Sequence, residues 1–213
     1  MKKQVYSLVL GERVISEIDK HAYRAGTSRS NLINQVLAEH VGFITPEKRM
    51  REIFRHVDGL IGGRQGFHAS LASSDTALML RSALNYKYNP SVKYCATLAD
   101  IPDTGLEVRI QVSLRSQNKG LLQALRRFFA IWIKIEQAYG KSREATLSGA
   151  KLEKTLSVPE YMAGNCARQA DFILSYIKAM DSAQNAYFSG DGDMVSTVKA
   201  VELVYLDYLK GQN

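Results

Sequence analysis

Residues 4–10 read QVYSLVL, and residues 11–42 continue as GERVISEIDKHAYRAGTSRSNLINQVLAEHVG. Alternation in the first seven residues predicts a β-strand, because successive side chains of a strand point to opposite faces. Both faces of this strand are nearly apolar. One face carries Tyr6, Leu8 and Leu10, and the other carries Val5, Ser7 and Val9. A strand that is apolar on both sides needs protein or another partner to cover it.

The hydrophobic period changes to three and four residues after this strand, which predicts two amphipathic helices. Gly26 suits the end of the first helix, because glycine adopts the left-handed cap conformation at little cost. Ser28 offers a side-chain oxygen as the N-cap of the second helix. The apolar side of the first helix consists of Val14, Ile15, Ile18, Ala22 and Ala25, and that of the second consists of Leu32, Ile33, Val36, Leu37 and Val41.

A unit made of one strand and two short helices cannot stand alone. Its strand leaves both backbone edges unpaired, and a segment of this length buries too little apolar surface. Two copies solve both problems, because their strands form an antiparallel ribbon and their helices interlock beneath Tyr6, Leu8 and Leu10. We therefore expect an obligate homodimer that forms through the N-terminal strand.

Residues 1–42 resemble a ribbon-helix-helix domain of the Arc/MetJ/CopG type. The resemblance depends on the short strand that ends at Leu10, the junction AYRAGTSRSNLI and the turn pattern G-x-S-R-S-x-L-I. It implies a DNA-binding protein whose β-ribbon enters the major groove, while the start of the second helix holds a backbone phosphate. The implied DNA-binding residues are Lys2, Lys3, Gln4, Val5, Ser7, Val9, Ser28, Arg29 and Ser30.

The outward face of the expected ribbon departs from the family pattern. Members usually carry Arg, Lys, Asn, Gln or Thr there, whereas this chain has Val5, Ser7 and Val9. Valine can contact a thymine methyl group and serine can bond either kind of base edge, so weak base reading is one interpretation. The alternative is that protein covers Val5 and Val9.

Composition bounds the remaining possibilities. The 213 residues include 28 Lys and Arg against 21 Asp and Glu, a net charge of +7 that suits a polyanionic partner. The four His and two Cys show no metal-ligand spacing, so we expect no metal and no cofactor. Cys95 and Cys166 are expected to stay reduced in a cytoplasmic protein without signal peptide or membrane span. Enzyme signature motifs are absent from the sequence, so we do not expect an enzyme.

The pattern divides the chain into a domain at 1–44, a connection at 45–75 and a second domain at 76–213. Thr45 and Pro46 begin the connecting helix, and the Gly- and Ser-rich residues 62–75 suggest a linker. In the second domain, strands are expected at 80–88, 92–98 and 106–115, followed by helices from 119, 159 and 194. The predicted class is α+β: a dimeric ribbon-helix-helix followed by a small antiparallel sheet packed with helices.

Two features of the second domain leave alternatives open. SGDGDM at 189–194 resembles part of a calcium loop but lacks the other ligands, so a plain turn is favoured. Basic residues between 87 and 135, with Tyr86, Tyr88 and Tyr94, suggest either a second nucleic-acid face or an ordinary solvated sheet face.

These observations predict a dimeric DNA-binding protein, and specifically a transcriptional regulator such as a repressor. The alternative is an antitoxin-like or plasmid-transfer or replication accessory protein. In that case the ribbon-helix-helix serves dimerisation, and a protein partner binds. The second domain would assemble the protein, sense a signal or hold a further protein partner.

Overall fold

The computed structural model describes residues 5–61, 66–71, 77–101, 105–140, 144–162, 164–190 and 193–212. The chain divides into two compact units, Met1–Arg49 and Met50–Asn213. Among the described residues there are six α-helices and one six-stranded antiparallel sheet, so the predicted α+β class is confirmed.

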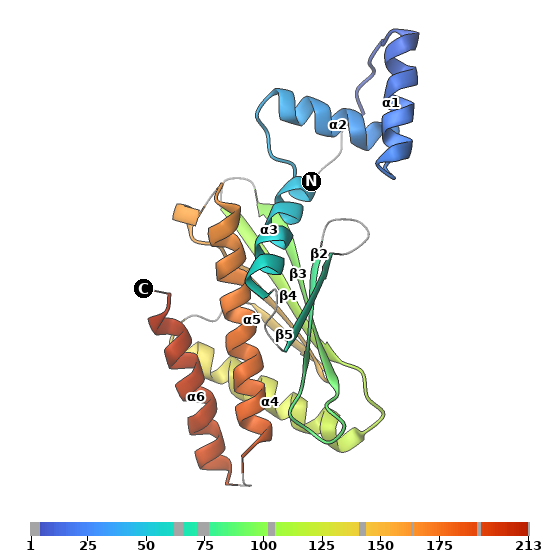
Figure 1. The fold of residues 1–213 in the computed structure, drawn as a ribbon. Helices are drawn as coiled ribbons and strands as arrows, with labels where there is room; N and C mark the ends of the chain where they lie inside the picture. Colours follow the sequence, from blue (N-terminus) through green and yellow to red (C-terminus); the bar gives the residue numbers. More distant parts are fainter. Residues whose placement is uncertain are drawn as a thin grey trace. The chain divides into compact units, whose positions relative to one another are not determined.

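The first regular element of the described residues is helix α1 (Glu12–Arg24), followed by α2 (Arg29–His40) (Figure 1). The strand expected at residues 4–10 is not present, since residues 5–10 belong to no strand and residue 4 lies outside the described residues. The structure therefore does not support an N-terminal strand in the single chain. The physical reason is that a strand is held by hydrogen bonds to a neighbour, and no other segment among the described residues pairs with this one.

Burial in the first unit also differs from the expectation. Only Ala22 and Ala38 are buried in α1 and α2. Side chains expected on the buried faces are instead exposed; they are Val14, Val36, Leu37 and Val41. The helices form as predicted because capping and periodicity are local, but two short helices do not enclose a core of their own.

The expected connecting helix is α3 (Pro46–Ile61), and it packs into a core rather than lying free of one. Its residues Met50, Ile53 and Val57 are buried in the core of the second unit. The expected linker at 62–75 is also interrupted, because Phe67–Leu71 form strand β1, which pairs with β2 (Ala77–Ala83). Residues 62–65 and 72–75 of that linker lie outside the described residues.

The sheet has the strand order β1-β2-β3-β4-β6-β5, with every neighbouring pair antiparallel. The remaining strands are β2 (Ala77–Ala83), β3 (Ser91–Ile101), β4 (Gly105–Leu114), β5 (Ala145–Ser148) and β6 (Lys151–Ser157). The alternation predicted for β4 is confirmed, since its buried residues are Leu106, Val108, Ile110, Val112 and Leu114. Strands β5 and β6 were not predicted.

The strand expected at 80–88 ends at Ala83 rather than at Tyr88. Tyr88 and Asn89 have positive φ angles of 67° and 44°, so the backbone turns there instead of continuing extended. The amide of Leu84 donates to the carbonyl oxygen of Pro90 at 3.0 Å, which closes the connection to β3. The turn thus ends the strand, although the alternation of the tyrosines predicts that it continues.

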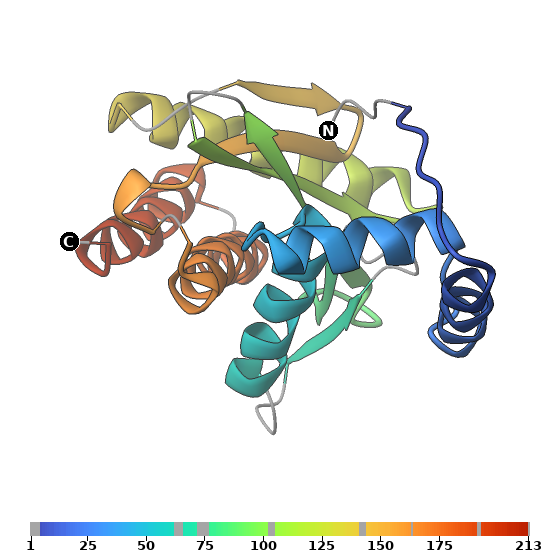
Figure 2. The same ribbon diagram turned by 90° about the horizontal axis from the view of Figure 1, so that it is seen from above.

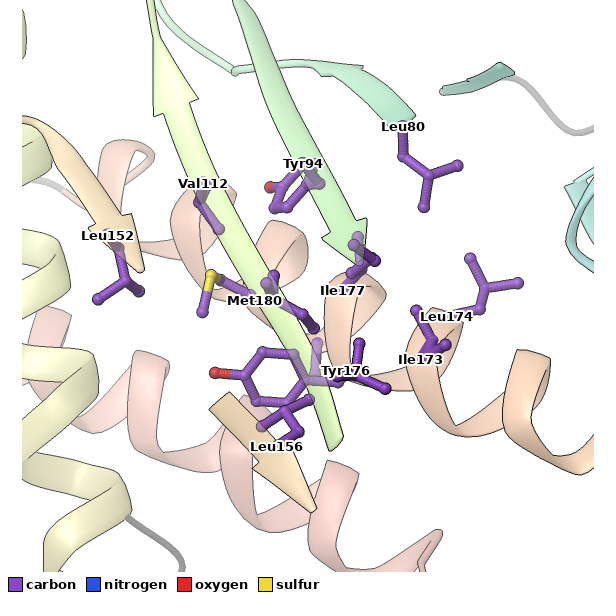
Figure 3. Packing of buried hydrophobic residues seen from close by; sticks show 14 of the residues in the cluster. Leu80, Tyr94, Val112, Leu152, Leu156, Ile173, Leu174, Tyr176, Ile177 and Met180 are labelled. Atoms are coloured by element: carbon purple, nitrogen blue, oxygen red, sulfur yellow. The ribbon is translucent and has the colours of Figure 1, made fainter. Parts of the chain in front are cut away.

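Three helices complete the core of the second unit: α4 (Lys119–Ala138), α5 (Cys166–Phe188) and α6 (Met194–Lys210). Helices α5 and α6 run side by side (Figures 1 and 2). Figure 3 shows buried residues of α5, among them Ile173, Tyr176 and Met180, in one cluster with the inward side chains of the sheet.

The helix expected from Pro159 begins instead at Cys166. Residues Glu160–Met162 form a single 3₁₀ turn, and Asn165 caps α5 by accepting a hydrogen bond from the Arg168 amide at 3.0 Å. An asparagine N-cap determines the start here, even though proline also suits the first helical turn.

Candidate functional site

The junction between α1 and α2 has the local geometry that the sequence predicts. Gly26 has a φ of +61°, and the amide of Thr27 donates to the carbonyl oxygen of Ala22 at 2.9 Å. Ser28 then caps α2, because its Oγ atom accepts from the amide of Asn31 at 3.2 Å. The first-turn amides at Arg29 and Ser30 have no intrahelical acceptor, so the helix start presents them to an external group. The Gly26 stop and the Ser28 cap are confirmed.

Arg29 is engaged by a carboxylate in this structure. Its Nε atom lies 2.5 Å from Oδ1 of Asp19, and its Nη2 atom lies 2.6 Å from Oδ2. Hydrogen bonding to Asp19 raises the pKa of Arg29. This bidentate pair ties the start of α2 to α1, a role that the sequence pattern did not indicate, and an anion at Arg29 would compete with Asp19.

The outward residues expected for the ribbon are fully open to solvent in the single chain. Val5 is 96% exposed and Val9 is 103% exposed, and Ser7 between them is also exposed. On the opposite face of the expected strand, Tyr6 and Leu8 are exposed as well. The predicted phosphate contacts Lys2, Lys3 and Gln4 lie outside the described residues.

The suggested second nucleic-acid face does not have the aromatic residues it needs. Tyr94 is buried and donates its hydroxyl to Asp181 Oδ1 at 2.9 Å. Tyr86 packs edge-on against Phe188, with 5.7 Å between ring centroids. Only Tyr88 of the three is exposed, so no aromatic platform for stacked bases forms.

The second unit contains a cavity of about 660 Å³ between β6 and helices α4, α5 and α6. The lining combines one acid, one base and several aromatic rings, including Glu136, Lys154, Phe172, Tyr176, Tyr205 and Tyr208. Sequence reasoning missed this site because β6 was not predicted. The available signal was a period of two in KLEKTLS, where Leu152, Lys154 and Leu156 share a face.

A buried ion pair lies at the wall of this cavity. Nζ of Lys154 contacts Oε2 of Glu136, while the Tyr176 hydroxyl donates to Oε1 of Glu136 at 3.0 Å. The indole Nε1 of Trp132 donates to the Tyr176 hydroxyl at 3.1 Å. Burial raises the pKa of Glu136 and lowers that of Lys154, against the attraction between the two charges.

Metal ligation and membrane insertion find no support in the part of the chain that the structure describes. There, no three His, Cys, Asp or Glu side chains come together, and no helix has the length and apolar character to cross a membrane.

Asp193 of the SGDGDM segment caps α6, with its Oδ2 atom accepting from the Ser196 amide at 2.9 Å. Asp191 and Gly192 lie outside the described residues.

No protein-family model, no curated protein and no solved structure matches this chain.

Proposed function

We propose that the chain is a dimeric DNA-binding protein that acts as a transcriptional regulator. In this proposal two copies pair residues 4–10 as an antiparallel ribbon, and the ribbon-helix-helix domain exists only in the dimer. The second unit of each copy then serves as an assembly or sensing domain.

One observation supports the dimer above all others: the first unit leaves its apolar side chains uncovered. Val9, Val36, Leu37 and Val41 are all at least half exposed in the single chain, and only two alanines of α1 and α2 are buried. Exposed apolar area of this extent marks an interaction surface. A second copy of the same segment fits it, because two leading segments satisfy each other's backbone groups while four helices share one core.

The start of α2 and the basic N-terminus support the choice of DNA as the partner. The amides at Arg29 and Ser30 and the positive end of the helix dipole suit a phosphate, and Lys2 and Lys3 add positive charge. Val5, Ser7 and Val9 would meet base edges, where the valines contact thymine methyl groups. Phosphate contacts therefore dominate the affinity, and base reading contributes little.

Two measurements on the full chain test the proposal. Sedimentation at micromolar concentration is expected to give twice the chain mass of 23.8 kDa. A gel shift with genomic and random fragments is expected to show binding to both, with modest preference. A lone 23.8 kDa species would refute the dimer, and a dimer that shifts no DNA would refute the DNA-binding function.

The salt dependence of binding tests the phosphate contacts. The double variant Lys2→Ala/Lys3→Ala is expected to bind all sequences more weakly and to reduce the slope of log K against log salt by about 0.9 for each lost contact. The control Arg126→Ala/Arg127→Ala removes the same charge from exposed positions on α4. If both variants reduce the slope equally, the salt dependence comes from the overall charge of the protein and not from contacts of the N-terminus.

A protein partner is the second candidate, and the exposure of Val5 and Val9 favours it. In an antitoxin-like or plasmid-transfer or replication accessory protein, a bound partner would cover this apolar face. The substitutions Val5→Thr and Val9→Thr distinguish the two functions. They are expected to retain DNA binding in a regulator and to weaken association with the partner in an accessory protein.

A further inference from the structure

We infer that the cavity of the second unit is a binding site for a flat, uncharged aromatic or heteroaromatic small molecule that carries hydrogen-bonding groups. The inference concerns the second unit alone and does not depend on DNA binding. Its support comes from the size, the charge and the hydrogen-bonding capacity of the lining.

The size and the lining suit a ring-shaped molecule. A volume of about 660 Å³ lies within the range of small-molecule sites, which is about 300–1,000 Å³. Tyr176, Tyr205 and Tyr208 line it, and their rings also pack on one another: the centroids of Tyr176 and Tyr208, and those of Tyr205 and Tyr208, lie 5.9 Å apart. Packed rings hold their faces and edges in fixed positions, which favours a flat aromatic partner.

The charges in the lining cancel, and this selects an uncharged ligand. Lys154 and Glu136 neutralise each other by direct contact, and Lys154 Nζ also lies 5.6 Å from the centroid of the Tyr176 ring. A charged ligand would lose its hydration and find no free counter-charge, because each ion already has its partner.

Two tyrosine hydroxyls of the lining are available for hydrogen bonds. The Tyr176 hydroxyl is used by Glu136 and Trp132, whereas those of Tyr205 and Tyr208 have no hydrogen-bond partner among the described residues. Burial raises the pKa of both Tyr205 and Tyr208, so both keep their protons and can donate at neutral pH. A ligand that carries an acceptor or a hydroxyl group can form hydrogen bonds with these two groups.

One scaffold in three charge states tests the inference on the full-length protein. The probes are tryptophol, which is neutral, indole-3-acetate, which is an anion, and tryptamine, which is a cation; quinoline and coumarin extend the neutral set. Saturation-transfer NMR and calorimetry are expected to show saturable binding of at least one neutral probe with a Kd below about 1 mM. The charged indoles are expected to bind at least tenfold more weakly than tryptophol.

Two variants connect the binding to this cavity. Tyr205→Phe removes one hydroxyl and keeps the ring, so tryptophol is expected to bind about fivefold more weakly. Leu209→Trp fills part of the cavity and is expected to abolish binding. The matched control Tyr88→Phe alters an exposed tyrosine outside the cavity and is expected to leave the Kd unchanged.

Three results would overturn the inference. The first is the absence of saturable binding by every neutral probe, which indicates a cavity that holds water only. The second is equal or tighter binding of a charged indole. The third is a Kd that Tyr205→Phe leaves unchanged, which places the bound probe elsewhere; this arm remains decisive if Leu209→Trp does not fold.

Discussion

Lys154 on β6 and Glu136 on α4 form an ion pair in which each side chain is only 1% exposed. The pair joins the sheet to a helix, and the Tyr176 hydroxyl extends it to α5. Removing two charges from water is costly, and their contact recovers that cost only when the geometry is good. Breaking the pair on one side is therefore expected to be more harmful than removing both charges.

The variant Lys154→Met is expected to lower the free energy of unfolding by about 3 kcal/mol at pH 7, because it leaves Glu136 buried without its counter-ion. The double variant Lys154→Met/Glu136→Gln is expected to recover most of this loss. Urea unfolding measures both. The control is Lys151→Met on the same strand, where the lysine is 44% exposed and the expected change is within about 0.5 kcal/mol.

The Lys154→Met variant also has an expected pH dependence. Burial already raises the pKa of Glu136, and loss of Lys154 removes an influence that opposes the rise. A carboxyl group whose pKa is higher in the folded than in the unfolded protein contributes its full stabilisation below its ordinary pKa, which is 4.5 for Glu136. This contribution is lost as the pH rises through the pKa of the folded state. The decrease in the free energy of unfolding caused by Lys154→Met should thus be smaller at pH 5 than at pH 8. A decrease that does not depend on pH would show that the unpaired charge of Glu136 is not its cause.

Asp181 is expected to stabilise the protein less as pH rises. Burial raises its pKa above the ordinary value of 3.8, while hydrogen bonds from Ser82 and Tyr94 oppose the rise. Its contribution is complete below pH 3.8 and is lost as pH increases through the folded pKa. Unfolding of the wild type and of Asp181→Asn between pH 4 and pH 8 measures this effect, and the advantage of the wild type should shrink with increasing pH.

The Ser28 cap is expected to contribute about 1 kcal/mol to α2, because Ser28→Ala leaves the Asn31 amide without its acceptor. The control Ser30→Ala changes an exposed serine in the first turn and is expected to have little effect. Circular dichroism during thermal unfolding checks the difference. Equal melting of both variants would show that the cap does not stabilise the helix.

Asp19 is expected to weaken DNA binding, because it occupies the guanidinium of Arg29. Under the proposed function, Asp19→Asn should increase the affinity and steepen the salt slope by about 0.9 per freed phosphate contact. The control Asp207→Asn removes the same charge beside Lys210 in the second unit. An identical gain from both variants would attribute the effect to net charge.

Local signals in the sequence were sufficient for most helices and for the clearest strand. Gly26 and Ser28 determine the turn between α1 and α2 by backbone and capping chemistry, which involves residues within one turn. The strict alternation of residues 106–115 indicates β4, because one face of that strand is buried along its whole length.

Strand β6 shows why part of the sheet escaped prediction. Its inward side chains are Leu152, Lys154 and Leu156, so a lysine occupies a central core position and interrupts the hydrophobic pattern. The lysine is tolerated there only because Glu136, eighteen positions earlier on another element, supplies its counter-charge. No local rule indicates that pairing.

The sequence alone determined where the helices α1, α2, α4 and α6 form and how β4 faces the core, because capping and periodicity act between neighbours in the chain. Tertiary structure decided the rest: the place of α3 in the core, the sheet partners of β1, β5 and β6, and the cavity beside Lys154. These features depend on contacts between residues distant in the chain, whose energies only the packed structure specifies.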